Sequence, residues 1–117
     1  MNLYEMDDQL LNVWVAKAEG HMIATIKPGV EITGYSIYYY SGDTPRIPRY
    51  TTEPGIADAL IAREGITTIH LRSFIPGYTY QASHPALKGS RGGPTEYIAA
   101  MRAYVASRYG NELPEEV

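Results

Sequence analysis

The sequence predicts a single α+β domain in which a sheet of about four strands, mixed or antiparallel, is covered by three helices. Apolar residues recur at helical spacing in three separate segments. Between these segments lie short stretches rich in β-branched and aromatic residues, which are typical of strands. The turn signal Pro76-Gly77 separates two such stretches and predicts a hairpin, so at least part of the sheet should be antiparallel.

The first helix is expected to begin at Asp7 or Asp8, either of which can cap it, and to end before Gly20. Its apolar residues follow helical spacing and form the face expected to be buried: Leu11, Trp14, Val15 and Ala18. Two strands should follow, over residues 21–26 and 30–40, because both stretches are rich in β-forming residues.

A loop over residues 41–49, marked by glycine and two prolines, leads to the second helix. We expect this helix from about Glu53 to Arg63, with Thr51 or Thr52 as its cap and Gly65 as its stop.

Two further strands are predicted over residues 66–75 and 78–82, followed by a loop over 83–93. Pro94 or Thr95 then opens the last helix, whose apolar face is Tyr97, Ile98, Met101, Tyr104 and Val105. That helix stops at Gly110. Residues 1–110 are therefore expected to form one globular domain, and residues 111–117 a disordered acidic tail.

The amino-acid composition and net charge argue against several classes of function. The 117 residues include no cysteine, which excludes disulfides, cysteine-ligated zinc and thiol nucleophiles and suits a cytoplasmic protein. A net charge of −3 argues against general nucleic-acid binding. The N-terminus lacks the pattern of a signal peptide, and no apolar run is long enough to span a membrane.

The clearest candidate for chemistry is the glycine-rich segment before the last helix. A helix N-terminus presents unpaired N–H groups and partial positive charge, and glycines allow a ligand to approach the backbone. The segment supplies cations and hydroxyls as well, so we expect it to bind an anion through Lys88, Ser90, Arg91, Gly92, Gly93 and Thr95. It matches neither the Walker loop nor the dinucleotide fingerprint, and the alternative is a plain surface loop.

A second loop contributes the other half of this hypothesis. It carries cations and tyrosines that could hold phosphate and stack on a base, namely Tyr40, Arg46, Arg49 and Tyr50. His84, near the glycine-rich segment, could add a donor. If the two loops meet at one edge of the sheet, together they would form a nucleotide site.

The same region supports a rival hypothesis. The chain has 11 tyrosines beside one phenylalanine and one tryptophan. Tyrosine combined with arginine is typical of protein-binding hot spots, so the Tyr35–Tyr50 region could dock a protein instead. Exposed tyrosines would also permit self-association into a homo-oligomer.

Catalysis and cofactor binding are not expected. The three histidines lie far apart in the sequence and form no metal-type pair with each other or with a carboxylate. Ser83 and His84 are neighbours, but they do not define a triad, and there is no nucleophile elbow. The sequence therefore predicts no enzyme activity, no metal and no cofactor.

Four short motifs resemble the phage ABA-sandwich proteins, a family of small phage-encoded domains. They are Val15-Ala16-Lys17-Ala18-Glu19-Gly20, Tyr50-Thr51-Thr52-Glu53-Pro54 before the second helix, Gly65-Ile66, and Tyr80-Gln81-Ala82 before a helix with Ala99, Ala100 and Tyr104. The chain departs from the family pattern at Glu53, where aspartate is usual, and at Tyr80, where tryptophan is usual.

The resemblance implies an α-β-α sandwich from a phage or prophage, acting in the host bacterial cytoplasm, and implies no particular activity. Small phage accessory proteins often block bacterial defence. Together with the anion hypothesis, this leads to our first expectation, that the protein sequesters a phosphate-containing signalling nucleotide. The alternative expectation is inhibition of a host defence or regulatory protein through a Tyr/Arg surface.

Overall fold

The computed structural model describes residues 1–21, 23–25, 35–37, 47–72 and 75–114. They form an α+β fold of three α-helices, a short 3₁₀ turn and five short strands in two separate sheets. The elements follow in the order η1 (Leu3–Glu5), α1 (Asp8–Ala18), β1 (Ile23–Thr25), β2 (Tyr35–Ile37), α2 (Pro54–Glu64), β3 (Thr67–His70), β4 (Tyr80–Ser83), β5 (Arg91–Gly93) and α3 (Glu96–Tyr109). The predicted fold class is confirmed, whereas the single sheet is replaced by two.

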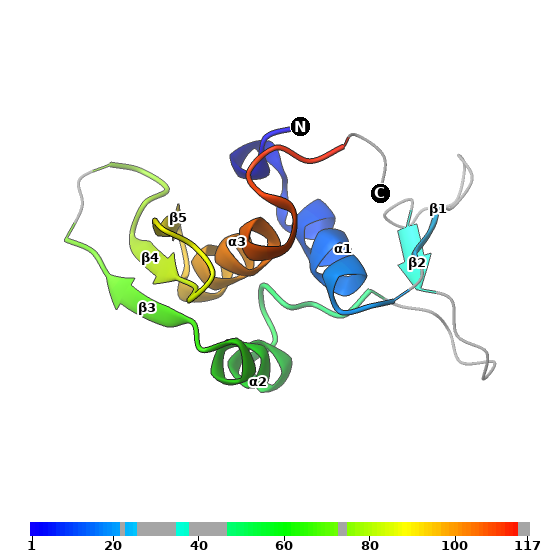
Figure 1. The fold of residues 1–117 in the computed structure, drawn as a ribbon, viewed down its shortest axis with the longest axis horizontal. Coiled ribbons are helices and arrows are strands. Elements are labelled where there is room, and N and C mark those ends of the chain that lie inside the picture. Colours follow the sequence, from blue (N-terminus) through cyan, green and yellow to red (C-terminus); the bar gives the residue numbers. More distant parts are fainter. Residues whose placement is uncertain (22, 26–34, 38–46, 73–74, 115–117) are drawn as a thin grey trace.

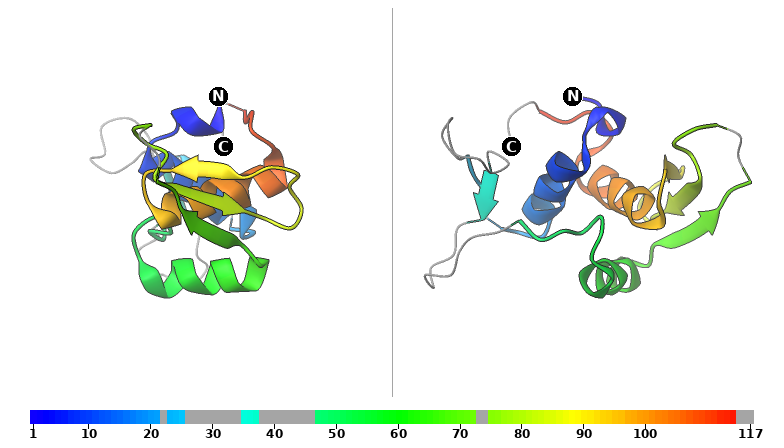
Figure 2. Two further views of the ribbon diagram at one scale, coloured as in Figure 1. Left: turned by 90° about the vertical axis from the view of Figure 1, so that its left-hand side faces the viewer. Right: turned by 180° about the vertical axis from the view of Figure 1, so that it is seen from behind.

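Helix α3 is the centre of the molecule. Nearly every side of it is buried, and it packs against the three-stranded sheet on one side and against α1 on the other (Figure 1). Its alanines allow this close approach, because a small side chain keeps neighbouring backbones near the helix axis. Helix α2 lies beside α3, on the β3 side of the sheet (Figure 2).

The three helices begin and end close to the predicted residues, because capping is local chemistry. Asp7 accepts a hydrogen bond from the Leu10 N–H and caps α1, and Thr95 does the same for α3 through the Ile98 N–H. Gly65 ends α2 with a φ of 69°, a left-handed conformation that favours glycine. The predicted cap of α2 was wrong: Glu53 holds the cap position, without a side-chain hydrogen bond, and Pro54 follows it.

The larger sheet has the order β3-β4-β5 and is antiparallel throughout. Its register places Thr68 opposite Ala82, and Tyr80 opposite Gly93. One face lies on α3. No described helix covers the other face, where Ile69 is 53% exposed, so the α-β-α sandwich is not confirmed.

The second sheet pairs β1 with β2 in antiparallel fashion, next to α1 (Figure 1). It falls within the two predicted strands 21–26 and 30–40. The remainder of the second predicted strand, and most of the loop over 41–49, lie outside the described residues.

Residues 111–114, the described part of the segment expected to be a disordered tail, pack against the N-terminal residues. Leu113 is buried in the core, and its N–H donates to the Met1 carbonyl. Asn2 forms a bridge with Glu112 and also donates from its side chain to the Glu112 carboxylate at 2.8 Å. Residues 1–2 and 112–113 therefore lie side by side, although they are more than 100 positions apart in the sequence.

Candidate functional site

The glycine-rich segment is a strand over part of its length, not a loop. Residues 91–93 form β5, the third strand of the sheet, within the predicted loop 83–93. A Cβ built on Gly93 would lie 2.7 Å from the Ala99 nitrogen, and one on Gly92 would lie 2.5 Å from the Tyr78 ring. Both glycines therefore serve close packing, of β5 on α3 and of Tyr78 on the sheet.

The start of α3 already has polar partners. Thr95 uses its hydroxyl to cap the Ile98 N–H at 3.2 Å. Glu96 places a carboxylate in the first turn and accepts a hydrogen bond from the Thr68 hydroxyl at 2.8 Å. A negative side chain at this position complements the helix dipole and competes with an anion.

The two basic side chains of the segment, Lys88 and Arg91, differ in their hydrogen-bond partners. Arg91 points into its own loop and toward the C-terminal segment, donating to the carbonyls of Gly89 and Ser90 and to Asn111 Oδ1 at 2.8 Å. Ser90 accepts a hydrogen bond from the Gln81 amide. Lys88 is exposed. Of this set, Lys88 is the cation with no protein partner among the described residues.

The second loop does not join this segment in the described residues. Tyr50 is buried in the core with 5% exposure, so its ring is not available for stacking on a base. Arg49 is exposed, and its carbonyl accepts from the N–H groups of Thr52 and Glu53 ahead of α2. In Figure 1 the segment that leads into α2 and strand β5 lie on different sides of α3. Tyr40 and Arg46 lie outside the described residues.

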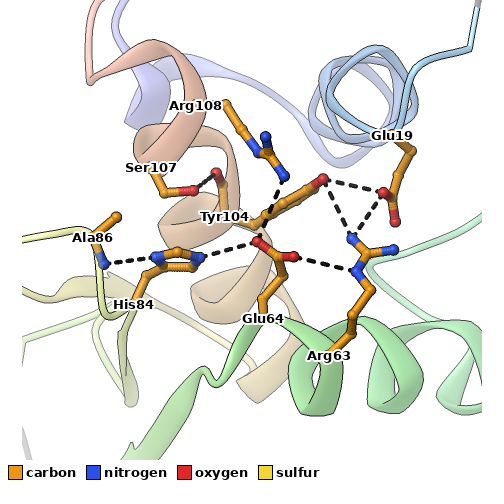
Figure 3. A network of polar contacts seen from close by, with 8 residues as sticks. All are labelled: Glu19, Arg63, Glu64, His84, Ala86, Tyr104, Ser107 and Arg108. Atoms are coloured by element: carbon orange, nitrogen blue, oxygen red, sulfur yellow. Dashed lines mark hydrogen bonds and ion pairs between the residues drawn. The ribbon is translucent and has the colours of Figure 1, made fainter.

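His84 belongs to a different polar cluster, shown in Figure 3. Its Nε2 lies 3.1 Å from Glu64 Oε1, and its Nδ1 accepts a hydrogen bond from the Ala86 N–H at 3.0 Å. Because Nδ1 is an acceptor, the proton of the neutral ring is assigned to Nε2, which donates to Glu64.

Arginines and a tyrosine extend this cluster to all three helices. Arg63 donates to Glu64 at 3.2 Å and to Glu19 at 2.8 Å, and the buried Tyr104 hydroxyl donates to Glu19 at 3.1 Å (Figure 3). Arg108 lies 3.9 Å from Glu64. We call Glu19, Arg63, Glu64, His84, Tyr104 and Arg108 the helix-end cluster.

The electrostatics of the helix-end cluster are balanced. Burial alone would raise the pKa of Glu64, but hydrogen bonds from His84 and Arg63 outweigh it and lower that pKa. The hydrogen bond to Glu19 is the main cause that raises the pKa of Arg63, and burial raises that of Tyr104. Two carboxylates neutralise two guanidinium groups, so the cluster joins helix ends and offers no excess charge to a ligand.

Sequence reasoning singled out His84 but missed its partners. Glu64 and Arg63 are adjacent at the end of the predicted second helix, and a helix end next to a glycine is a usual place for polar side chains. Nothing local indicates that this end lies beside a residue 20 positions further on.

A second group of polar contacts closes the outer edge of β5. The Tyr4 hydroxyl accepts the Gly92 N–H at 3.2 Å, and Arg102 Nη1 donates to the Gly92 carbonyl at 2.9 Å. The Arg102 guanidinium also lies 4.9 Å from the centre of the Tyr4 ring. Burial lowers the pKa of Arg102, partly offset by the nearby tyrosines. Both outward backbone groups of Gly92 are thus satisfied by side chains.

The exposed apolar side chains gather on the β3–β4 hairpin. Five large apolar residues in the described part of the chain are exposed, and three of them are Ile69, Ile75 and Tyr78, with 53%, 62% and 41% exposure. The register puts Ile69, Gln81 and Gly92 in one row on one face, and Tyr78 lies over Gly92 on that face. We call Ile69, Ile75 and Tyr78 the hairpin patch.

Within the described residues, no group of three or more potential metal ligands occurs, and no helix is long and apolar enough to cross a membrane. Comparison of the chain with protein-family models and with curated protein sequences gives no match. The resemblance to the phage ABA-sandwich proteins therefore stays a prediction that rests on the sequence motifs.

Proposed function

We propose that this protein is a non-enzymatic binding domain that docks a host protein through the hairpin patch and inhibits it. The observation that carries the proposal is that one hairpin bears three exposed apolar side chains, two of which, Ile69 and Tyr78, lie on a sheet face that no described helix covers. The host and the inhibitory role follow from the resemblance to small phage proteins.

The chemistry of the patch fits a protein surface. Branched aliphatic side chains and a tyrosine on the same hairpin provide apolar area with a polar tip, which is the composition of many interface anchors. The Tyr78 ring lies over Gly92, and its centre is 6.1 Å from that of the Tyr4 ring, so these contacts favour one position of a side chain that is still 41% exposed. Arg72, exposed on the same hairpin, supplies a charge for the polar rim.

The test compares capture of proteins from a bacterial lysate by the tagged wild type and by Ile75→Asp. We expect the substitution to abolish retention of a specific protein, since a carboxylate would have to be desolvated in the interface. Ala59→Asp, which adds the same charge at an exposed position of α2, is the matched control and should retain that protein. If Ile75→Asp and wild type retain the same proteins, the hairpin patch is not the docking surface.

Nucleotide sequestration is the second candidate, supported by the exposed Lys88 beside Ser90 and Arg91. A ligand that binds only the folded protein raises its melting temperature. We therefore expect a panel of linear and cyclic nucleotides to stabilise the wild type but not Lys88→Ala if this candidate is right. Unchanged melting temperatures across the panel would eliminate it without affecting the protein-binding proposal.

A further inference from the structure

The two edge strands of the three-stranded sheet, β3 and β5, differ in whether side chains bind their outward backbone groups. An edge strand presents unpaired N–H and C=O groups that can pair with another chain, and folded proteins usually block such edges. At the β5 edge, Tyr4 and Arg102 satisfy both outward groups of Gly92. The β3 edge has no corresponding side-chain partners within the described residues.

The outward groups of β3 can be identified from the ladder. The Leu71 N–H donates to the Thr79 carbonyl at 2.7 Å, so Leu71 faces β4. Backbone groups alternate in direction along a strand, which means that Ile69 also faces β4, whereas the N–H and C=O groups of Thr68 and His70 face away from it. Thr67, Ile69 and His70 are exposed, consistent with an open edge.

The sequence of β3 contains none of the usual devices against pairing. Edge strands are commonly protected by lysine or another charge, by proline or by a bulge. Thr67-Thr68-Ile69-His70 has no Lys, Arg, Asp, Glu or Pro, and it pairs with β4 in unbroken register. Three of its residues are β-branched and suit a strand.

We propose that the β3 edge pairs in antiparallel fashion with the β3 edge of a second copy of this chain, with the two-fold axis passing through Ile69. Thr68 then lies opposite His70 of the second copy, and each such pair exchanges two backbone hydrogen bonds. The two Ile69 side chains face each other across the axis on the uncovered face, at a non-hydrogen-bonded position where side chains are closest. This inference does not depend on the proposed function. In the dimer Ile69 is covered by the second copy, so a docked host protein would contact the other two residues of the hairpin patch, Ile75 and Tyr78.

A second copy of this chain is the expected partner because the β3 edge is complementary to itself. A two-fold interface brings the same patch to itself, which is favourable only if no charge meets its own copy. β3 is uncharged, and its exposed apolar residue falls at the centre of the strand. Pairing through a second copy therefore covers Ile69 with Ile69 and satisfies the outward groups of Thr68 and His70 together.

Alternative registers are less favourable. A shift toward the start of β3 would pair His70 with Ile66, whose N–H is already bound to the Ile61 carbonyl at 3.0 Å. The opposite shift would centre the axis on His70 and place two imidazole rings, instead of two isoleucines, across from each other. The register centred on Ile69 avoids both costs.

Cysteine cross-linking tests the register, because the chain has no cysteine of its own. Ile69→Cys should form a disulfide-linked dimer under mild oxidation, since its two Cα atoms would lie within disulfide range. Thr67→Cys, on the same face of the same strand, is the matched control. In this register its two copies lie about 13 Å apart along the strands, too far to cross-link.

Sedimentation tests the interface itself with the purified protein. We expect the wild type to be a dimer, and Ile69→Lys and Ile69→Glu each to raise the dissociation constant about tenfold or more, because like charges would lie opposite each other. Mixing the two variants should restore a dimer. Ser83→Lys, one strand away from the edge, should leave the dimer intact.

Three results would overturn the inference: a wild type that stays monomeric up to high micromolar concentration, an Ile69→Lys variant that dimerises as well as the wild type, or cross-linking of Thr67→Cys as rapid as that of Ile69→Cys. Circular dichroism of each variant confirms that it is folded. These measurements involve no host protein, so their outcome is separate from that of the lysate experiment.

Discussion

Substitution of Gly93 by alanine separates the two explanations for the glycine-rich segment. If the glycine is needed for close packing, the new methyl group must damage the contact between β5 and α3. Its Cβ would lie 2.7 Å from the nitrogen of Ala99 and 3.0 Å from its Cα. These are backbone atoms of a helix that is buried on nearly every side, so neither partner can move without displacing other contacts.

The expected cost follows from two opposing effects. Overpacking of a core costs typically about 1–3 kcal/mol, and a clash with helix backbone belongs at the upper end, about 3 kcal/mol. Replacing glycine also restricts the unfolded chain, which returns up to about 1 kcal/mol. The net loss is about 2 kcal/mol, equivalent to a fall in melting temperature of about 8 °C for a domain of this size.

Urea unfolding followed by tryptophan fluorescence measures this loss. Trp14 is the one tryptophan of the chain, and it is buried with its ring 5.2 Å from that of Tyr109, so its emission reports loss of the core. Gly92→Ala is the matched control. Its new methyl group would meet the Tyr78 ring, a side chain that is 41% exposed and can rotate away, so the cost should be under about 1 kcal/mol.

A second control tests the identity of the clashing atoms. Ala99→Gly in the Gly93→Ala background removes the Ala99 methyl group but leaves the nitrogen and Cα in place, and it should not restore stability. The reasoning is refuted if Gly93→Ala unfolds at the same urea concentration as the wild type, or if Ala99→Gly rescues it.

Three further predictions concern buried or half-buried polar groups. Because the pKa of Glu64 is lowered in the folded protein, its carboxylate contributes fully to the free energy of unfolding above the ordinary pKa of 4.5, and this contribution is lost as pH falls through the lower folded value. Glu64→Gln should therefore cost about 1–2 kcal/mol at pH 7 and progressively less in acid, as measured by urea unfolding at several pH values. An equal cost at all pH values would contradict this prediction. Tyr4→Phe leaves the Gly92 N–H without its acceptor and should cost about 1–2 kcal/mol in the same assay, whereas no loss would show that the contact contributes nothing. Thr51→Val removes a buried hydroxyl that has no hydrogen-bond partner among the described residues, and it should raise the free energy of unfolding by about 1 kcal/mol. A lower melting temperature would show that this hydroxyl does have a stabilising partner.

Local chemistry made the helices predictable. Asp7 and Thr95 cap helices through N–H groups three residues away, and Gly65 ends α2 through its own backbone conformation. Interactions of this range are encoded within a few residues, so the sequence alone determines where the helices lie. The hairpin formed by β3 and β4 was also predictable, because a strong turn signal lies between two β-rich stretches.

The role of the glycine-rich segment depended on residues distant in the sequence. Glycine before a helix is compatible with ligand binding and with close packing. Close packing explains these glycines because Ala99 and Tyr78 lie against them, and both residues approach only after the chain has folded. Likewise, His84 was noticed for its place near this segment, but its partner is Glu64, at the end of another helix.

By itself, the sequence determined the fold class, the three helices and the absence of cysteine chemistry, because each depends on composition or on contacts within one turn. The tertiary structure decided that β5 completes the sheet, that Tyr4 and Arg102 close one edge of it, and that the residues of the hairpin patch are exposed. Burial and strand pairing join residues far apart in the chain, so which surfaces remain exposed is a property of the whole fold and not of any segment.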